Sequence, residues 1–136
     1  MIRPIIHDEM FLSLPSEKAG KEDLQTVQDL RDTLHSVRER CAGMAANMIG
    51  VNKNIIAVTM PFGEMVMINP VIIRKAEAYE TEEGCLSLKG QRKTTRYKKI
   101  TVRWQNENME VMKADFSGFT AQVIQHETDH CAGILI

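Results

Sequence analysis

The sequence predicts an α+β fold, in which antiparallel β-sheets pack around a C-terminal helix. Strand-like runs rich in Ile and Val, separated by short turns, fill most of residues 54–116. An amphipathic helix precedes these runs, and a last helix follows them, beginning at Ser117 or Gly118. No repeat, low-complexity tract or linker interrupts the chain, so residues 1–136 are expected to form a single domain.

The composition is that of a globular protein with a substantial core, at 136 residues, 43% hydrophobic and 26% charged. A net charge of −1 argues against nucleic acid as an electrostatically bound partner. The chain has no apolar run long enough to span a membrane and no signal-peptide pattern, so we expect a cytoplasmic protein without a membrane partner. The three cysteines suggest no disulfide framework, which leaves metal ligands or buried apolar groups.

The first forty residues are expected to hold one helix. The opening through Gly20 is irregular, because two prolines and several small residues interrupt it. From Glu22 to Arg40, apolar residues recur at helical spacing. His35 on this helix and His7 before it are expected to be surface or boundary residues rather than ligands.

Residues 41–50 (Cys-Ala-Gly-Met-Ala-Ala-Asn-Met-Ile-Gly) form a segment of small side chains. The segment is too rich in glycine for a plain helix and too compact for a linker. It could be a tight helix-to-strand connection, or a place where another backbone or a ligand lies close.

Five segments have the pattern of strands. They are residues 54–60, 65–69, 71–80, 100–104 and 109–116. Residues 61–63 and 106–108 are expected to be turns, and the pair Asn69-Pro70 is expected to break the second run. Residues 89–99 are markedly basic, which is typical of a solvated face, although such a face could also meet a peptide.

The last helix carries Gln-His-Glu-Thr-Asp-His at residues 125–130. Histidines four apart on a helix lie about 40° apart, so the imidazoles of His126 and His130 can reach one metal ion. Glu127, between them, can hold a carboxylate beside the position left for water. The alternative is an accidental spacing on a polar helix face. Residues 131–136 contain no His, Asp or Glu, so the third ligand must come from upstream, unlike that of the common zinc proteases.

Cys85 is the best candidate for this third ligand. It lies in Glu-Gly-Cys-Leu-Ser, at the end of a strand-like run and beside a glycine. Cys131 directly follows His130 and points about 100° round the helix from it, which makes it a poor ligand. Cys41 lies in the small-residue segment. The alternative is that Cys85 is a buried thiol with no ligand role. The presence of the histidine pair makes this alternative weaker.

The chain resembles the peptide deformylases, whose three motifs occur here in the same order. These are Gly-x-Gly-hydrophobic-Ala-Ala-x-Gln, Glu-Gly-Cys-Leu-Ser and Gln-His-Glu-x-Asp-His. The second and third are intact. In the first, Cys41 replaces a glycine and Met48 replaces the glutamine, so the chain is a divergent member. The resemblance covers nearly the whole chain and implies a peptide deformylase-like fold around a metal-binding helix.

The resemblance implies one divalent metal ion, natively Fe(II), which Zn, Ni or Co can replace. The ligands would be Cys85, His126 and His130. Glu127 would take a proton from the attacking water and pass it to the leaving amine, while the N–H of Leu86 would donate to the developing oxyanion. The reaction would remove the N-formyl group from the initiator methionine of nascent polypeptides and release formate, with the ribosome as a further candidate partner.

The resemblance also implies a substrate cleft. Gly43 and Gly84 would let the peptide backbone lie close, like an added strand. The expected walls for the methionine side chain are Met44, Leu86, Phe119 and Val123.

Met48 bears on efficiency, because a thioether cannot donate the hydrogen bond that the family's glutamine gives to the formyl oxygen. Losing one such donor typically costs about 10²–10³ in rate. Asn47 is a candidate substitute, and Lys89 and Gln122 are further departures from the family. Three interpretations remain: a deformylase, with full or reduced activity or acting on another N-acyl substrate; a metal-binding relative with a binding or regulatory role; and a metallopeptidase of another kind.

Overall fold

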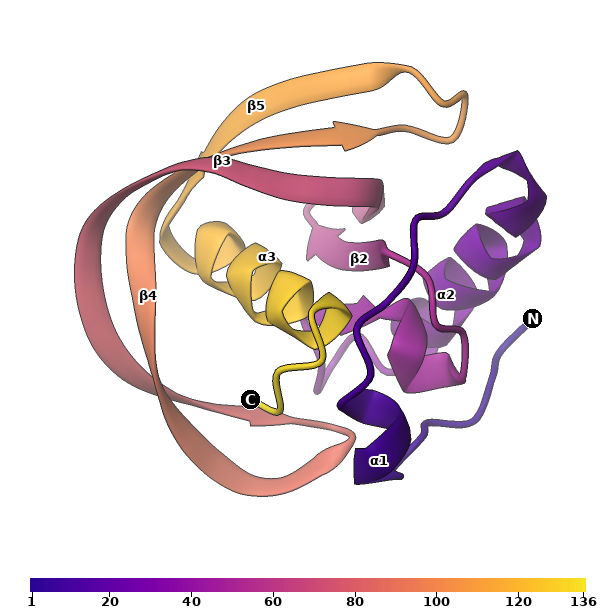
Figure 1. Ribbon diagram of the computed structural model, residues 1–136, viewed down its shortest axis with the longest axis horizontal. Coiled ribbons are helices and arrows are strands. Elements are labelled where there is room, and N and C mark those ends of the chain that lie inside the picture. The colour runs from indigo at the N-terminus through magenta and orange to yellow at the C-terminus, as the bar shows by residue number, and fades with distance from the viewer.

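The computed structural model describes residues 1–136 and contains a five-stranded antiparallel sheet that curves around one helix (Figure 1). The strands are hydrogen-bonded in chain order: β1 (Gly43–Ala45), β2 (Ile55–Met60), β3 (Gly63–Cys85), β4 (Leu88–Gln105) and β5 (Val111–Ser117). The enclosed helix is α3 (Gly118–Cys131), and the long β3–β4 hairpin bends around it. The antiparallel sheet and C-terminal helix of the predicted α+β fold are confirmed.

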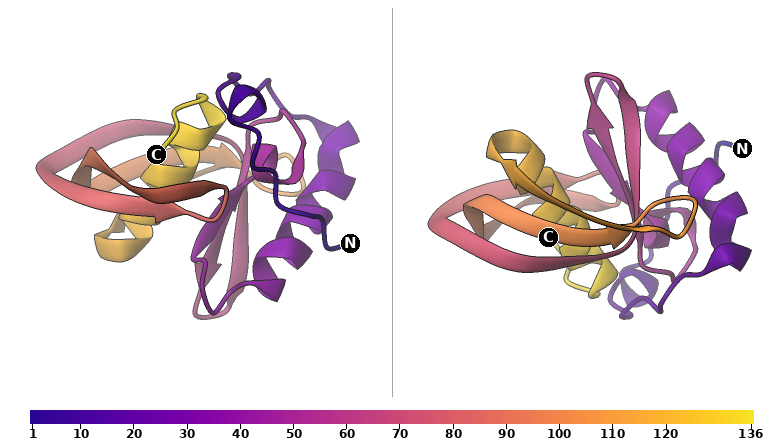
Figure 2. Two further views of the ribbon diagram at one scale, coloured as in Figure 1. Left: turned by 90° about the horizontal axis from the view of Figure 1, so that it is seen from below. Right: turned by 90° about the horizontal axis from the view of Figure 1, so that it is seen from above.

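The remaining helices lie on the N-terminal side of the molecule. They are α1 (Glu9–Leu12), α2 (Leu24–Ser36) and two short 3-10 helices, η1 (Lys21–Asp23) and η2 (Ala46–Ile49). Figure 2 shows that the long hairpin extends to one side together with α3, while α2 lies on the other side of β1 and β2. None of these helices is long and apolar enough to cross a membrane.

The N-terminal half differs from expectation in three places. Helix α2 ends at Ser36, and residues 37–40 form turns, so the predicted helix is too long. The opening contains α1, a single turn too short to show periodicity, in which the Asp8 side chain accepts a hydrogen bond from the Met10 N–H. Residues 41–50 hold strand β1 and helix η2 instead of a plain connection.

The pair Asn69-Pro70 bends strand β3 without ending it. The pairing register with β4 shifts between Ile68 and Val71, and Asn69 takes φ 53, so the two residues form a bulge. The Asn69 side chain holds the bulge by accepting from the Ala19 N–H and donating to the Ala19 carbonyl. The basic residues 89–99, expected as a solvated face, belong to strand β4.

Helix α3 is fixed in the curve of the sheet by apolar burial and by one glutamine. Ile124 is fully buried and belongs to the same core cluster as Ile56 of β2. The Gln125 side chain accepts from the Tyr97 N–H and donates to the Tyr97 carbonyl, both at 2.8 Å. These contacts fix which face of α3 turns toward the end of strand β3.

Candidate active site

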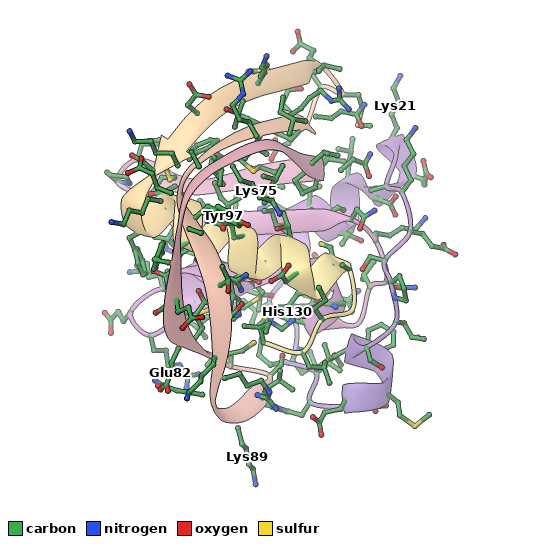
Figure 3. All side chains as sticks on the ribbon, turned by 60° about the vertical axis from the view of Figure 1, so that its left-hand side comes forward. Lys21, Lys75, Glu82, Lys89, Tyr97 and His130 are labelled. Carbon is green, nitrogen blue, oxygen red and sulfur yellow. The ribbon has the colours of Figure 1, made fainter.

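The structure brings together the three predicted metal ligands. Cys85 ends strand β3, while His126 and His130 lie one turn apart on α3. Their ligand atoms all lie within 4.8 Å of one another, and the two Nε2 atoms are 3.1 Å apart. Figure 3 places His130 on α3, on the side enclosed by the rest of the fold. One thiolate and two imidazoles form a donor set for a transition metal or zinc.

His126 is held through its ring. Its Nδ1–H donates to Glu83 Oε1 at 2.7 Å, which leaves Nε2 directed at the other ligands. Burial alone would lower the pKa of His126, but the hydrogen bonds that its ring donates to Cys85 and Glu83 outweigh burial and raise the pKa to about 10. A cation that binds Nε2 therefore has to displace a proton.

His130 is fully buried, and its environment favours the neutral ring. Burial and the neighbouring His126 lower the pKa of His130 to about 4, so its imidazole has a free lone pair near neutral pH. Nδ1 of His130 has no hydrogen-bond partner. Nε2, which faces His126, is therefore the atom through which His130 would bind a cation.

Glu127 lies beside the ligands with a free carboxylate oxygen. Its side chain is buried, and Oε1 has no hydrogen-bond partner in the protein. Burial raises the pKa of Glu127 to about 7, so the carboxylate can both accept and return a proton near neutral pH. A general base beside an open metal position needs these properties.

Cys85, His126 and Glu127 line a cleft of about 510 Å³, whereas His130 is fully buried and does not reach its wall. Of the predicted site residues, those on its wall are Gly43, Met48, Gly84, Cys85, Leu86, Phe119, Val123, His126 and Glu127. Met44, predicted as a wall of the methionine pocket, is not among them. Its side chain is fully buried in the core, because alternation along β1 turns it away from the cleft. That prediction is wrong.

The absence of a side chain at Gly43 makes room for helix α3. A Cβ at this position would lie 2.5 Å from Val123 Cγ1 and 3.1 Å from Glu127 Oε2. The missing side chain therefore lets α3 approach β1 and seats the Glu127 carboxylate. A Cβ at Gly84 would make only ordinary contacts, the nearest at 3.5 Å from the Gly90 carbonyl oxygen, so the fold does not require that glycine.

Met48 and Asn47 point in different directions. The Met48 side chain lines the cleft, and its Sδ accepts a hydrogen bond from the Ala45 N–H at 3.5 Å. Asn47, the candidate substitute for the missing glutamine, lies outside the cleft lining and donates instead to the His130 carbonyl. The idea that Asn47 replaces the glutamine amide is therefore wrong.

A buried ionic cluster supports the site. The Arg96 guanidinium binds both oxygens of Glu83 and, through Nη1, Asp129 Oδ2 at 2.6 Å. Gln122 Nε2 donates to Glu83 Oε2 at 2.9 Å, which explains an amide where the family has an apolar residue. Sequence reasoning missed Arg96, because it is one of several cations in the basic run. Only the folded structure, in which Arg96 lies opposite α3, distinguishes it from the other cations of this run.

The other residues of the basic run, and His7 and His35, lie outside the cleft. No residue of the basic run 89–99 lines the cleft, and Lys89 points away from the molecule at the tip of the β3–β4 hairpin (Figure 3). His7 Nδ1 lies 3.1 Å from the Ser87 carbonyl oxygen, and His35 pairs with Glu64. Neither histidine joins the metal-ligand cluster.

The cluster predicts an acid-dependent loss of stability. Burial would raise the pKa of Glu83, but its hydrogen bonds outweigh burial and lower the pKa from 4.5 to about 2. A depressed carboxyl pKa stabilises the fold above pH 4.5, and this contribution is lost as the pH falls from 4.5 to about 2. We expect Glu83→Gln to be less stable than wild type near pH 6, with the difference narrowing below pH 4.5. Urea unfolding of chelator-treated protein across this range measures it, and a constant difference would contradict the assignment.

Three protein donors would leave one coordination position of a metal ion for water. The buried carboxylate of Glu127 lies beside these donors, on the wall of a cleft that can hold a peptide-sized ligand. The fold and the site together define a metal-dependent hydrolase.

Comparison with known proteins narrows this class. Residues 7–136 match the family model for polypeptide deformylase. A peptide deformylase of Clostridium beijerinckii is 52% identical over 136 residues, covering 100% of both chains. The Met-Ala-Ser-bound class I type b peptide deformylase of Acinetobacter baumannii superposes with a TM-score of 0.87 at 26% identity, over 99% of this chain and 97% of that chain. A peptide deformylase of Legionella pneumophila gives a TM-score of 0.89 at 27% identity, over 99% and 83% of the two chains. The chain belongs to the peptide deformylase family.

Proposed function

We propose that this protein removes the N-formyl group from the initiator methionine of nascent polypeptides and releases formate. The observation that carries the proposal is the free, buried carboxylate of Glu127 beside the Cys85, His126 and His130 cluster at an open cleft. The relatives support the same substrate, since one solved structure binds a peptide that begins with methionine, as the product would. Residues 1–136 would act as one catalytic domain.

We propose Cys85, His126 and His130 as the ligands of one divalent metal ion. The two facing Nε2 atoms and the grouping of all three ligand atoms within 4.8 Å fit such an ion. One thiolate and two imidazoles suit Fe(II), Zn(II), Ni(II) or Co(II), and family membership favours Fe(II). When bound, the ion would supply Lewis-acid chemistry.

The chain's own groups would handle the proton and the developing charge. Glu127 would take a proton from the attacking water and transfer it to the leaving amine. Leu86, in the turn after Cys85, would donate its N–H to the oxyanion. Both roles agree with the position of these residues on the cleft wall.

The cleft would hold the peptide as an added strand. Strand β1 pairs only with β2, so one of its edges is free to bind an extended backbone. Gly43 lies on β1, and Gly84 lies near the end of β3, both on the cleft wall. Phe119 and Val123 would contact the methionine side chain.

Met48→Gln is expected to raise kcat/KM for a formyl-Met-Ala peptide by up to about 10²-fold. The glutamine carbonyl could accept from the Ala45 N–H in place of Sδ, leaving its amide N–H free to donate in the cleft. Formate release at equal metal content measures the effect. Met48→Leu, which has a similar size and no donor, should give no gain, and an equal gain in both variants would exclude the hydrogen bond as the cause.

Formate release by anaerobically purified protein loaded with Fe(II) or Ni(II) tests the whole proposal. Release of formate supports it. Binding of metal and peptide without turnover would favour a relative with a regulatory role. The replacement of the family's glutamine by Met48 is the reason to consider that interpretation. Peptide cleavage without formate would indicate another metallopeptidase. Because the substrate arises at translating ribosomes, we place the reaction in the cytoplasm; contact with the ribosome itself stays a prediction.

A further inference from the structure

The two metal-binding histidines are held in different ways. The ring of His126 is oriented by Glu83, which accepts from its Nδ1–H. The ring of His130 has no such support. The backbone of Ile136 lies near it, yet Nδ1 has no partner within hydrogen-bond geometry. Since metal-binding histidines usually need their other nitrogen held, His130 has to be oriented by another route.

The backbone of His130 supplies that route. The Asn47 side chain, which is 1% exposed, donates from Nδ2 to the His130 carbonyl oxygen at 2.8 Å. His130 lies in the last turn of α3, where carbonyl groups lack partners within the helix and the backbone frays most easily. The Gly133 N–H reaches the same carbonyl from the chain that follows, whereas Asn47 reaches it from helix η2, 83 positions away in the sequence.

The unpaired half of the Asn47 amide indicates that its donor matters. Asn47 Oδ1 is buried without a hydrogen-bond partner. Such an unsatisfied acceptor destabilises the fold, and leucine would provide the same branched shape without a buried polar atom. Packing alone therefore does not explain an asparagine at this position. The N–H that it donates to the His130 carbonyl is the property that an apolar residue of similar shape would lack.

We infer that Asn47 is a positioning residue for the metal centre, acting on His130 through its backbone as Glu83 acts on His126 through its ring. The inference rests on the proposed metal site. By fixing the last turn of α3, Asn47 keeps Nε2 of His130 at its 3.1 Å distance from Nε2 of His126. Helix η2 thus contributes two adjacent residues with separate tasks, Met48 on the cleft wall and Asn47 behind the ligands.

Asn47→Leu separates the donor from the side-chain shape, because it keeps the branching at Cγ and the number of side-chain atoms and removes the donor. Co(II) affinity is measured by competition with a chelator, together with the d–d and thiolate-to-Co(II) absorption bands and the Tm of the metal-free protein. We expect a Tm equal to or above that of wild type, a d–d spectrum altered by a displaced His130, a retained thiolate band, and Co(II) binding weaker by about 10–100-fold.

Asn69→Ala is the matched control, because it removes part-buried side-chain hydrogen bonds to Ala19 and Gln105, residues that belong neither to the ligand cluster nor to the cleft wall. It should lower the Tm and leave Co(II) affinity unchanged. If Asn47→Leu does not fold, Asn47→Ala replaces it, with affinity measured on the folded fraction. Wild-type affinity and spectrum in the Asn47 variant would overturn the inference. Failure of wild type to bind Co(II) would instead overturn the proposed metal site.

Discussion

Glu127→Gln is expected to lower formate release by about 10²–10⁴-fold, the usual contribution of a general acid–base group. Glutamine keeps the size of the side chain but cannot accept a proton and return it. The loss should fall on kcat, because Glu127 is buried on the cleft wall and its Oε1 has no other partner in the protein, so it is free for proton transfer. Steady-state assays with a formyl-Met-Ala peptide separate kcat from KM.

The interpretation requires that the metal centre survives the substitution. Metal content and the Co(II) spectrum of Glu127→Gln should match those of wild type, because Glu127 is not one of the three grouped ligands. Turnover within tenfold of wild type, at equal metal content, would exclude Glu127 as the proton carrier.

Cys85→Ala is expected to weaken metal binding by more than about 100-fold, which exceeds the typical effect of losing a residue that merely orients a ligand. No other thiol or carboxylate joins the cluster of Cys85, His126 and His130, so nothing replaces the lost sulfur. Formate release should fall to background. Metal analysis after desalting and loss of the thiolate-to-Co(II) band measure the effect.

Cys41→Ala provides the control for this experiment. Cys41 lines the same cleft, but its thiol donates to the Gly43 carbonyl, and burial raises its pKa to about 12. It should therefore remain a protonated thiol, and its loss should leave metal affinity unchanged. If Cys41→Ala loses metal while Cys85→Ala retains it, the assignment of the third ligand is wrong.

The grouping of Cys85, His126 and His130 could be predicted from the sequence, because helical spacing alone brings the two histidines together and a short motif identified the cysteine. The partners that hold them could not. Arg96 and Glu83 meet through strand pairing and the docking of α3, and Asn47 reaches His130 only after two distant segments pack. No periodicity records such contacts.

The fold shows the same division. Hydrophobic alternation and turn residues predicted most strands and the start of α3, since those signals are local. Asn69-Pro70 was expected to end a strand but forms a bulge. The side-chain contacts that hold this bulge come from Ala19, a distant part of the chain, so the local sequence does not indicate them. Met44 was assigned to the cleft from the family resemblance, which does not show that this side chain lies on the buried face of β1.

The order of β3, β4 and α3 along the chain also determines when the proposed metal centre can form during folding. The hairpin of β3 and β4 curves around α3, which follows it in the sequence, so the hairpin is synthesised before the helix that fills it. Until α3 docks, the concave side of the hairpin has no apolar partner, and Cys85 has no imidazole beside it. Closing contacts between such distant segments is a slow step in folding. Metal capture should therefore coincide with the final docking of α3, which makes the rate of metal uptake by refolding protein a measure of when folding ends.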